Sequence, residues 1–310
     1  MRSVLYGVTP LDPTPRAPRS VPPHAHDLPM ATMALSTGQT SYVDTGAGPP
    51  VLLLHGAPMT ALGFARVIRA LAPHHRVLAP DFPGFGGSTA APTFDGSLAA
   101  YAAFVVEFCE TLDLRNLVVY VNDTSGCIGL DAMARIRSRV RGVVVADTTP
   151  LPLTGRAWLV KFVLRYMVTS WPMRALNRRF NLLPWLVARV APLWHPLPRP
   201  IRDAMTAQFD TPAKRDRVMD VLRHVADDER FLRRAARSAA ASSDCPALVL
   251  FGQFDPMRMV GGVAHWRDVF PRCTSVVIPY EEHFPILGSG AQVAAAVHSW
   301  MEALPGEDAA

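Results

Sequence analysis

The order of its apolar segments constrains the fold of this chain more than any other feature. Short apolar stretches, each long enough for a single strand, alternate along the sequence with longer segments that have a helical period. Such strict alternation predicts an α/β fold with a mostly parallel sheet that is covered by helices on both faces. A hairpin over residues 33–44 precedes the alternation. We expect strands at 51–54, 76–79, 142–146, 247–251 and 274–279, and helices at 61–72, 97–112, 260–269 and 290–303.

The alternation is interrupted once, between residues 148–150 and the strand that starts at residue 247. The residues between these points have a helical pattern, are basic and are broken by several Pro residues. We therefore expect a helical cap over residues 150–242, inserted after the sixth strand. The core domain is then formed by two segments of the chain, 31–149 and 243–310.

Residues 1–30 contain seven Pro residues and show no helical or strand period, which predicts an irregular N-terminal arm. Pro10 ends the first apolar stretch before the hydrophobic region of a signal peptide can form, so we expect a cytoplasmic protein. No apolar run reaches the roughly 18 to 20 residues of a membrane-spanning helix, so we expect no stable membrane insertion. The four Cys residues lack metal-ligand spacing and are predicted to be buried free thiols. We expect neither a metal nor a cofactor.

Charge is distributed unevenly along the chain. Residues 151–242 contain 17 Lys and Arg but only seven Asp and Glu, a net charge of +10, whereas the rest of the chain has a net charge of −5. A basic segment could attract an anionic substrate or a lipid surface. Arg residues more often simply solvate the exposed face of a helix, and this is the interpretation we adopt. Nothing resembles a nucleic-acid-binding motif, and the sequence does not indicate an oligomeric state.

One apolar strand leads directly into small residues and then into a helix. The strand begins at Leu117, and the helical pattern continues through Arg137. A strand, a sharp turn and a helix with a reactive side chain at the apex form a nucleophile elbow. Asp123 takes the apex here, because the small Ser125 lies two residues later and Gly126 lets the helix pack close to the strand. The alternative interpretation is that Asp123 only caps the N-terminus of the helix.

Three further loops follow strands at the edge where open α/β sheets place their active sites. In the tight turn after the first of these strands, the Ala57 amide is placed to form an oxyanion hole together with the Thr124 amide. Asp255 follows the strand before the last, and His283 follows the last strand. Each residue alone is weak evidence, but their occurrence in this order predicts a catalytic triad of Asp123, Asp255 and His283.

With these motifs the chain resembles the α/β-hydrolase superfamily, specifically its branch of epoxide hydrolases and haloalkane dehalogenases, which use an Asp nucleophile. The resemblance covers residues 31–303 and implies the α/β-hydrolase fold. Two departures matter: dehalogenases of this branch usually have a halide-binding Asn after the H-G pair and a Trp after the nucleophile, whereas this chain has Ala57 and Thr124. The matching motifs are the Asp elbow, H-G-x-P at 55–58, D-x-P-G-F-G-x-S at 81–88, G-x-x-D-P at 252–256 and H-F-P at 283–285.

A carboxylate nucleophile changes the reaction that can be expected. With an ordinary pKa of about 3.9, Asp123 is ionised at neutral pH without help from a base. Attack on an ester carbonyl would give a reactive anhydride, whereas attack on an sp³ carbon gives an ordinary alkyl ester. We therefore expect a hydrolase that forms a covalent alkyl-Asp ester with a small hydrophobic organic substrate, and His283, oriented by Asp255, then activates water. Some members of this branch carry the acid after the sixth strand, where Asp147 is the alternative acid.

The leaving group distinguishes two activities. An opened epoxide leaves as an alkoxide and needs a proton, for which Tyr166, a Tyr of the cap, is the candidate donor; it could equally belong to the cap core. Because both usual halide donors are absent, we expect an epoxide hydrolase that produces a diol. A haloalkane dehalogenase-like hydrolase is the alternative, and a non-catalytic protein that binds a small ligand is the alternative of another class. Candidate halide donors from the cap are Trp158, Trp171, Trp185 and Trp194.

Overall fold

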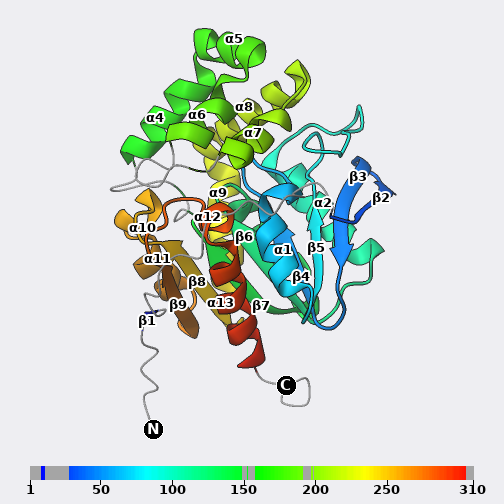
Figure 1. Cartoon of the computed structure of the whole chain (residues 1–310), viewed down its shortest axis with the longest axis vertical. Helices are drawn as coiled ribbons and strands as arrows, with labels where there is room; N and C mark the ends of the chain where they lie inside the picture. Colours follow the sequence, from blue (N-terminus) through cyan, green and yellow to red (C-terminus); the bar gives the residue numbers. More distant parts are fainter. Residues whose placement is uncertain are drawn as a thin grey trace.

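The structure, a computed structural model, describes residues 8–10, 28–148, 152, 158–190, 197 and 199–304. Their strands are β1 (Val8–Pro10), β2 (Met30–Leu35), β3 (Gly38–Thr45), β4 (Pro50–Leu54), β5 (Arg76–Pro80), β6 (Leu117–Asn122), β7 (Val140–Ala146), β8 (Ala247–Gly252) and β9 (Cys273–Ile278). Within the described ranges these strands form one nine-stranded sheet in the order β1-β9-β8-β7-β6-β4-β5-β3-β2 (Figure 1). The pairs β2–β3 and β3–β5 are antiparallel and all others are parallel, so the predicted mostly parallel sheet is confirmed.

The arm differs from the prediction at one point. Residues Val8–Pro10 form an edge strand that pairs in parallel with β9, with Val8 opposite Ser275. Pro10 is compatible with this position because an edge strand has one side free of ladder hydrogen bonds. A three-residue strand whose partner lies more than 260 residues away leaves no periodic signal in the sequence.

The central strands are buried on both faces, which explains their continuous apolar sequences. Every residue of β6 and of β8 is buried. Their side chains alternate between two clusters, so that Leu52 and Leu54 contribute to one cluster and Val51 and Leu53 to the other. The parallel register places Asn122 opposite Ala146, which brings the carboxyl ends of neighbouring strands to the same edge of the sheet.

Helices complete both core layers. The cluster on one face involves α1 (Ala65–Leu71) and α13 (Gly290–Glu302), which contact each other. The cluster on the other face involves α2 (Leu98–Thr111), α3 (Ser125–Arg135) and α9 (Glu229–Ala241). Shorter helical segments are η1 (Ala61–Phe64), η2 (Arg137–Arg139), α10 (Pro256–Met259), α11 (Gly262–Val269) and α12 (Pro285–Gly288).

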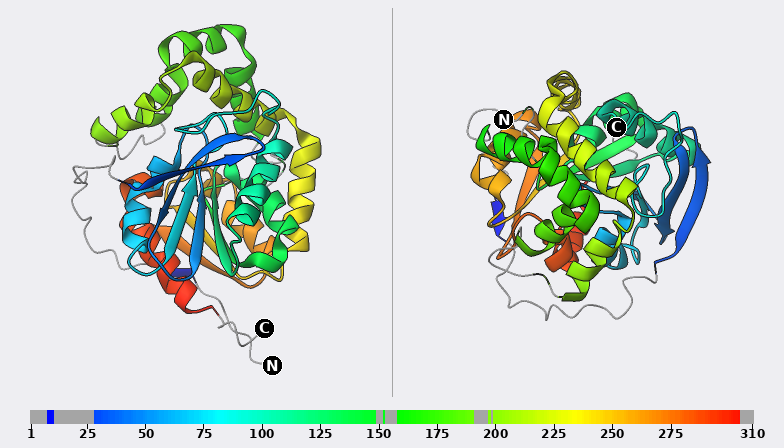
Figure 2. Two further views of the ribbon diagram at one scale, coloured as in Figure 1. Left: turned by 90° about the vertical axis from the view of Figure 1, so that its right-hand side faces the viewer. Right: turned by 90° about the horizontal axis from the view of Figure 1, so that it is seen from above.

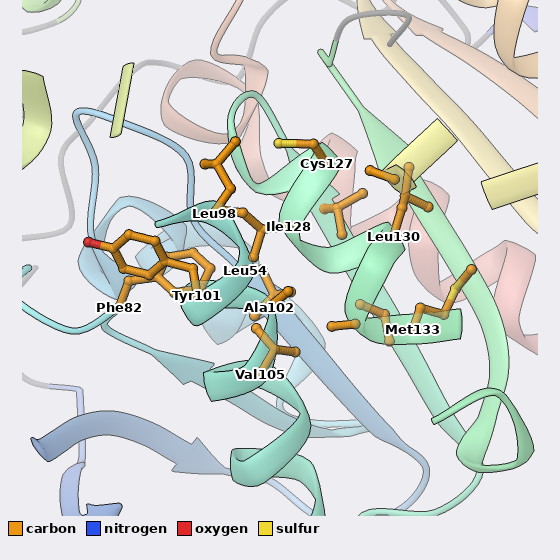
Figure 3. Close-up of a cluster of buried hydrophobic side chains, with 14 of the residues drawn as sticks. Leu54, Phe82, Leu98, Tyr101, Ala102, Val105, Cys127, Ile128, Leu130 and Met133 are labelled. Atoms are coloured by element: carbon orange, nitrogen blue, oxygen red, sulfur yellow. The ribbon is translucent and has the colours of Figure 1, made fainter. Parts of the chain in front are cut away.

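The packing between α2 and α3 fixes the element on which the site is built. Tyr101, Ala102 and Val105 from α2 lie beside Ile128 from α3, and Leu54 of β4 lies near them (Figure 3). Burying a side chain of this size contributes roughly 1.5–3 kcal/mol. This packing therefore holds α3, and with it the turn before its first residue, in one position on the sheet.

The inserted segment follows β7, the sixth strand of the sequence prediction, and is helical as expected. Its helices α4–α8 lie beyond one end of the sheet, opposite the end of the molecule at which α13 finishes (Figures 1 and 2). The last helix of the insertion, α9, returns to pack against α3 (Figure 2). These helices are α4 (Trp158–Thr169), α5 (Trp171–Phe180), α6 (Leu182–Val190), α7 (Arg199–Ala207) and α8 (Pro212–Asp227).

All four Cys residues are free and buried, which confirms the prediction. Among the helices in the described ranges, none has the length and apolar character needed to cross a membrane.

Candidate active site

The predicted elbow is present between β6 and α3. Asp123 lies between the two elements with a positive φ of 48°, a left-handed conformation that non-Gly residues rarely adopt. The Gly126 amide donates to the Asp123 carbonyl (3.1 Å) and closes the turn. Thr124, not Asp123, is at the N-cap of α3, and its side chain makes no capping hydrogen bond. The fold therefore contradicts the alternative that Asp123 is only a helix cap.

The neighbours of Asp123 explain why it is the residue at the apex. Ser125 is fully buried, and its hydroxyl donates to the Leu54 carbonyl (2.7 Å) while accepting from the Asn122 amide (2.9 Å). This hydroxyl is therefore not available as a nucleophile. A Cβ atom on Gly56 would overlap the Asp123 carboxylate. Glycine at position 56 thus leaves the space that the Asp123 side chain occupies.

The loops after β8 and β9 bring Asp255 and His283 to the elbow. His283 Nδ1 lies 3.1 Å from Asp255 Oδ1, and His283 Nε2 lies 3.5 Å from Asp123 Oδ1. Asp255 is fully buried and also accepts a hydrogen bond from the Met257 amide (2.7 Å) as the N-cap of α10. An ionised carboxylate can only accept, so the Nδ1 of His283 carries a proton and Nε2 faces Asp123. The three residues of the predicted triad are thus adjacent in space.

Electrostatics couple these three groups. Burial alone would lower the pKa of His283, but the charge of Asp255 and hydrogen bonds to Asp123 and Asp255 raise it well above its ordinary value of 6.5. Burial would conversely raise the pKa of Asp255, but the charge and hydrogen bond of His283 hold it below its ordinary value. In the free protein, therefore, His283 is stabilised as an imidazolium between two carboxylates.

Neutralising Asp123 should lower the pKa of His283. In an Asp123→Asn variant the imidazolium loses one of its two carboxylate neighbours, which is also what an alkyl ester on Asp123 would do. We expect the His283 resonance to titrate at a lower pH in this variant than in the unaltered protein, as measured by NMR of the labelled imidazole. A tenfold change in the protonation equilibrium corresponds to about 1.4 kcal/mol of lost interaction. Equal pKa values in the two proteins would show that Asp123 does not act on His283.

Asp147, the alternative acid, lies beside this cluster but is bonded differently. It follows β7 with a positive φ of 44°, and its Oδ1 accepts a hydrogen bond from the Gly252 amide (2.9 Å). Burial, the negative charge of Asp255 and a hydrogen bond to Asp255 raise the pKa of Asp147 well above its ordinary value. Asp147 is therefore the protonated member of the pair, and Asp255 is the ionised one that bonds to His283.

The turn after β4 supplies an amide to the Asp123 carboxylate. The Ala57 amide donates to Asp123 Oδ2 (2.9 Å) and also to the Thr124 hydroxyl (3.0 Å). Oδ2 is therefore the carboxylate oxygen next to the predicted oxyanion hole, and Oδ1 is the oxygen that faces His283. The Thr124 amide as the second donor stays a prediction.

A small pocket adjoins the Ala57 turn and Thr124. It has about 200 Å³ of space between its walls, part of it open to solvent. Its lining is mostly apolar and includes Val221 from the cap helix α8, so the cap closes part of the site. Other lining residues are His55, Phe82, Phe85, Tyr101 and Ile128.

His55 in this pocket wall has a structural function. Burial lowers the pKa of His55 to about 4, so the ring is neutral at pH 7. Its Nε2 accepts from the Phe82 amide (3.0 Å), which leaves Nδ1 to donate to the Gly56 carbonyl (2.9 Å). Both ring nitrogens are engaged, and the imidazole fixes the turn that carries Ala57.

The structure does not bring the cap aromatic residues to this pocket. Tyr166 lies on α4 with 63% of its surface exposed and is not among the described residues that line the pocket. Trp158, Trp171 and Trp185 are also exposed, at 62%, 79% and 45%. Trp194 lies outside the described residues.

Sequence reasoning missed Tyr101, the tyrosine that does line the pocket. Its side chain is buried, and its hydroxyl donates to the Pro83 carbonyl (3.2 Å). Burial raises the pKa of Tyr101, so the hydroxyl stays protonated over the whole physiological pH range. Tyr101 lies within the long helix α2 and belongs to no local motif; only the packing of α2 beside the sheet brings it to the site.

The sequence matches the alpha/beta hydrolase fold family over residues 49–289. Haloalkane dehalogenase 2 of Mycobacterium tuberculosis is 29% identical over 266 residues, which cover 84% of this chain and 91% of that protein. Among solved structures, haloalkane dehalogenase DbeA from Bradyrhizobium elkani has a TM-score of 0.77 at 20% identity, covering 90% of this chain and 99% of its own. The epoxide hydrolase CorEH has a TM-score of 0.76 at 17% identity, covering 89% and 99%.

The match extends over both core segments and the intervening helices, and the candidate site brings the predicted nucleophile, acid and His together at the carboxyl edge of the sheet. This chain belongs to the α/β-hydrolase family, in the branch that contains haloalkane dehalogenases and epoxide hydrolases.

Proposed function

We propose that this hydrolase opens epoxides and releases diols through a covalent ester on Asp123. The observation that supports it best is the arrangement of the Asp123 carboxylate. One of its oxygens accepts from the Ala57 amide, and the other faces the His283–Asp255 pair. A carboxylate in this position is suited to attack on an sp³ carbon, followed by hydrolysis of the resulting ester.

In the first step, Asp123 Oδ1 attacks one epoxide carbon, and the electron pair of the broken C–O bond passes to the epoxide oxygen. That oxygen needs a proton. We assign the donor to Tyr101 because this residue lines the pocket and its hydroxyl stays protonated, whereas Tyr166 is exposed on the cap. The tyrosinate recovers a proton, through water, from the His283 imidazolium, which loses its Nε2 proton once Asp123 is no longer charged.

In the second step, His283 Nε2 takes a proton from a water molecule, and the water oxygen attacks Cγ of the Asp123 ester. The negative charge on Oδ2 is stabilised by the Ala57 amide, which already donates to this atom, and by the predicted Thr124 amide. The tetrahedral intermediate releases the diol oxygen from Cγ, and His283 returns the proton to it. The Asp123 carboxyl group then gives the remaining proton of the water to His283, which restores the carboxylate and the imidazolium. Alkylation has meanwhile neutralised Asp123, which lowers the pKa of His283 and makes the neutral imidazole, the form that can accept a proton, available for this step.

Haloalkane dehalogenation is the second candidate because curated relatives carry that name. A departing halide needs N–H donors, and neither Asn nor Trp occupies the two positions where this branch usually has them. None of the described Trp side chains lines the pocket. Two such donors are worth roughly 1.5–3 kcal/mol each. Their joint absence should slow carbon–halogen cleavage by about two to four decades.

A matched substrate panel tests the proposal. Terminal epoxides such as 1,2-epoxyhexane and haloalkanes such as 1-bromohexane and 1-chlorohexane are compared by diol formation and halide release. We expect kcat/KM for the epoxide to exceed that for the haloalkanes by about 100-fold or more. Tyr101→Phe should slow epoxide opening by about 100-fold, because general acid catalysis is typically worth 10² or more.

Tyr166→Phe is the matched control and should leave epoxide opening unchanged, because this side chain is exposed on α4. Halide release that outpaces diol formation would overturn the epoxide proposal in favour of dehalogenation. An epoxide activity that is insensitive to Tyr101→Phe but reduced by Tyr166→Phe would show that the proton donor is Tyr166 of the cap.

A further inference from the structure

Exposed aromatic side chains are concentrated on three consecutive helices of the cap. Each of them has at least 45% of its surface exposed, and α4 contacts α5, which in turn contacts α6. These helices lie at the end of the molecule opposite the C-terminal end of α13 (Figures 1 and 2). We define the aromatic cap surface as Trp158, Phe162 and Tyr166 of α4, Trp171 and Phe180 of α5, and Trp185 of α6.

The first of these helices has a second apolar face that its packing does not need. Trp158, Phe162 and Tyr166 are four residues apart, so they lie on one face of α4. They are 62%, 61% and 63% exposed, whereas Val168 is fully buried in the core cluster and α4 packs on α8. Large aromatic side chains on a solvent-facing helical stripe mark an interaction site rather than a solvated face.

The stripe continues into the next helices. The Ser170 amide donates to the Tyr166 carbonyl (3.1 Å) and the Arg174 amide to the Ser170 carbonyl (3.0 Å). Ser170, with an extended backbone, is therefore the single residue that separates α4 from α5. Trp171, 79% exposed, follows directly. An arginine flanks the other aromatic residues: Arg179 lies 5.1 Å from the Phe180 ring, and Arg189 lies 4.9 Å from the Trp185 ring.

The net charge of the cap indicates which partner fits the aromatic cap surface. Residues 151–242 have a net charge of +10, so a second copy of the chain would bring two strongly basic caps together. An anionic bilayer surface complements both features, because Arg residues are attracted to acidic headgroups and Trp and Tyr are favoured at the membrane–water interface. We propose that the aromatic cap surface docks on an anionic lipid bilayer, with the cap lying on the membrane and not crossing it.

Docking of the cap has a consequence that rests on the proposed function. The cap helix α8 contributes Val221 to the pocket, so the pocket lies on the cap side of the core. A cap that lies on the bilayer would place the pocket next to the lipid phase, in which apolar substrates dissolve. The binding experiment below does not depend on any substrate, so failure of the proposed function would leave it intact.

The experiment uses the full chain and vesicles. We expect co-sedimentation with vesicles of equal parts phosphatidylglycerol and phosphatidylcholine, and at least about tenfold weaker partitioning to phosphatidylcholine alone. Raising the salt concentration from 0.1 to 1 M should weaken binding to the anionic vesicles. A triple variant, Phe162→Ser, Tyr166→Ser and Trp171→Ser, should lose at least about tenfold in partitioning. Met259→Ser is the control, because Met259 on α10 is 70% exposed but lies on the core.

Because the lipid and salt comparisons use the unaltered protein, the proposal stays testable if the triple variant does not fold. It is overturned if the protein fails to bind anionic vesicles at millimolar lipid, or if it binds both vesicle types equally. Partitioning that is unchanged in the triple variant, or reduced equally by Met259→Ser, overturns it as well. A dimer in light scattering that becomes a monomer in the triple variant would instead assign the surface to a second copy of the chain.

Discussion

Replacing His283 with Gln should stop turnover after the first chemical step and trap substrate on Asp123. Alkylation uses the Asp123 carboxylate and the proton donor but does not need His283 as a base, whereas hydrolysis of the ester needs this base, which lies 3.5 Å from Asp123. We expect kcat to fall by at least about 10⁴-fold, as it does when the base of a comparable triad is removed. Mass spectrometry of the intact protein and of its peptides should show an adduct on Asp123. Gln retains an N–H donor for the buried Asp255 carboxylate, which limits loss of stability.

The mass of the adduct also shows whether it formed by epoxide opening or by halide displacement. Ring opening adds the whole mass of the epoxide, whereas displacement of halide adds the substrate mass without the hydrogen halide. Asp123→Asn combined with His283→Gln is the control and should show no adduct. An unmodified Asp123 in the His283→Gln protein under saturating substrate would contradict the two-step mechanism.

Replacing Asp255 with Asn should lower kcat by about 10⁴-fold, because an amide in this position stabilises the wrong tautomer of the catalytic imidazole. Asp255 is the carboxylate 3.1 Å from His283 Nδ1, and its pKa is held low, so it is ionised when it orients the ring. Asn can still accept from the Met257 amide, which preserves the cap of α10. Steady-state kinetics on the best substrate of the panel measure the loss.

Asp147→Asn is the matched variant and should cost less than about tenfold. The raised pKa of Asp147 makes it a neutral O–H donor, and an Asn side chain supplies an N–H donor in its place and keeps the acceptor for the Gly252 amide. If the loss at position 147 exceeds that at position 255, the acid of the triad is Asp147. Equal losses would show that the two carboxyl groups act as one unit.

The parts of the site that could be predicted from sequence are those fixed locally at strand ends. Asp123, Asp255 and His283 each lie in a short loop after a buried strand, and parallel strands bring such loops to one edge of the sheet. The small residues around Asp123 also fixed which of the neighbouring side chains would be at the apex. These features depend on residues within a few positions of one another.

The parts that could not be predicted depend on packing between distant segments. Tyr101 reaches the pocket because α2 packs beside α3 on one face of the sheet, and nothing near it in sequence distinguishes it from another core aromatic residue. Tyr166 was selected as a Tyr of the cap, but the rotation of α4 on α8 turns its face to solvent. The Pro residues of the insertion indicate where its helices begin and end, but they do not indicate how each helix is rotated about its axis.

The loops that carry the reactive groups are joined to each other by the backbone. The Asp123 amide donates to the Asp147 carbonyl (3.3 Å), the Gly252 amide to the Asp147 carboxyl group (2.9 Å), and the Phe254 amide to the Glu281 carbonyl (2.8 Å). These bonds form a continuous rim from the end of β6 to the end of β9 without using any residue of the cap. The cap can therefore diverge, and change what the enzyme accepts, while the reactive centre below it keeps its geometry.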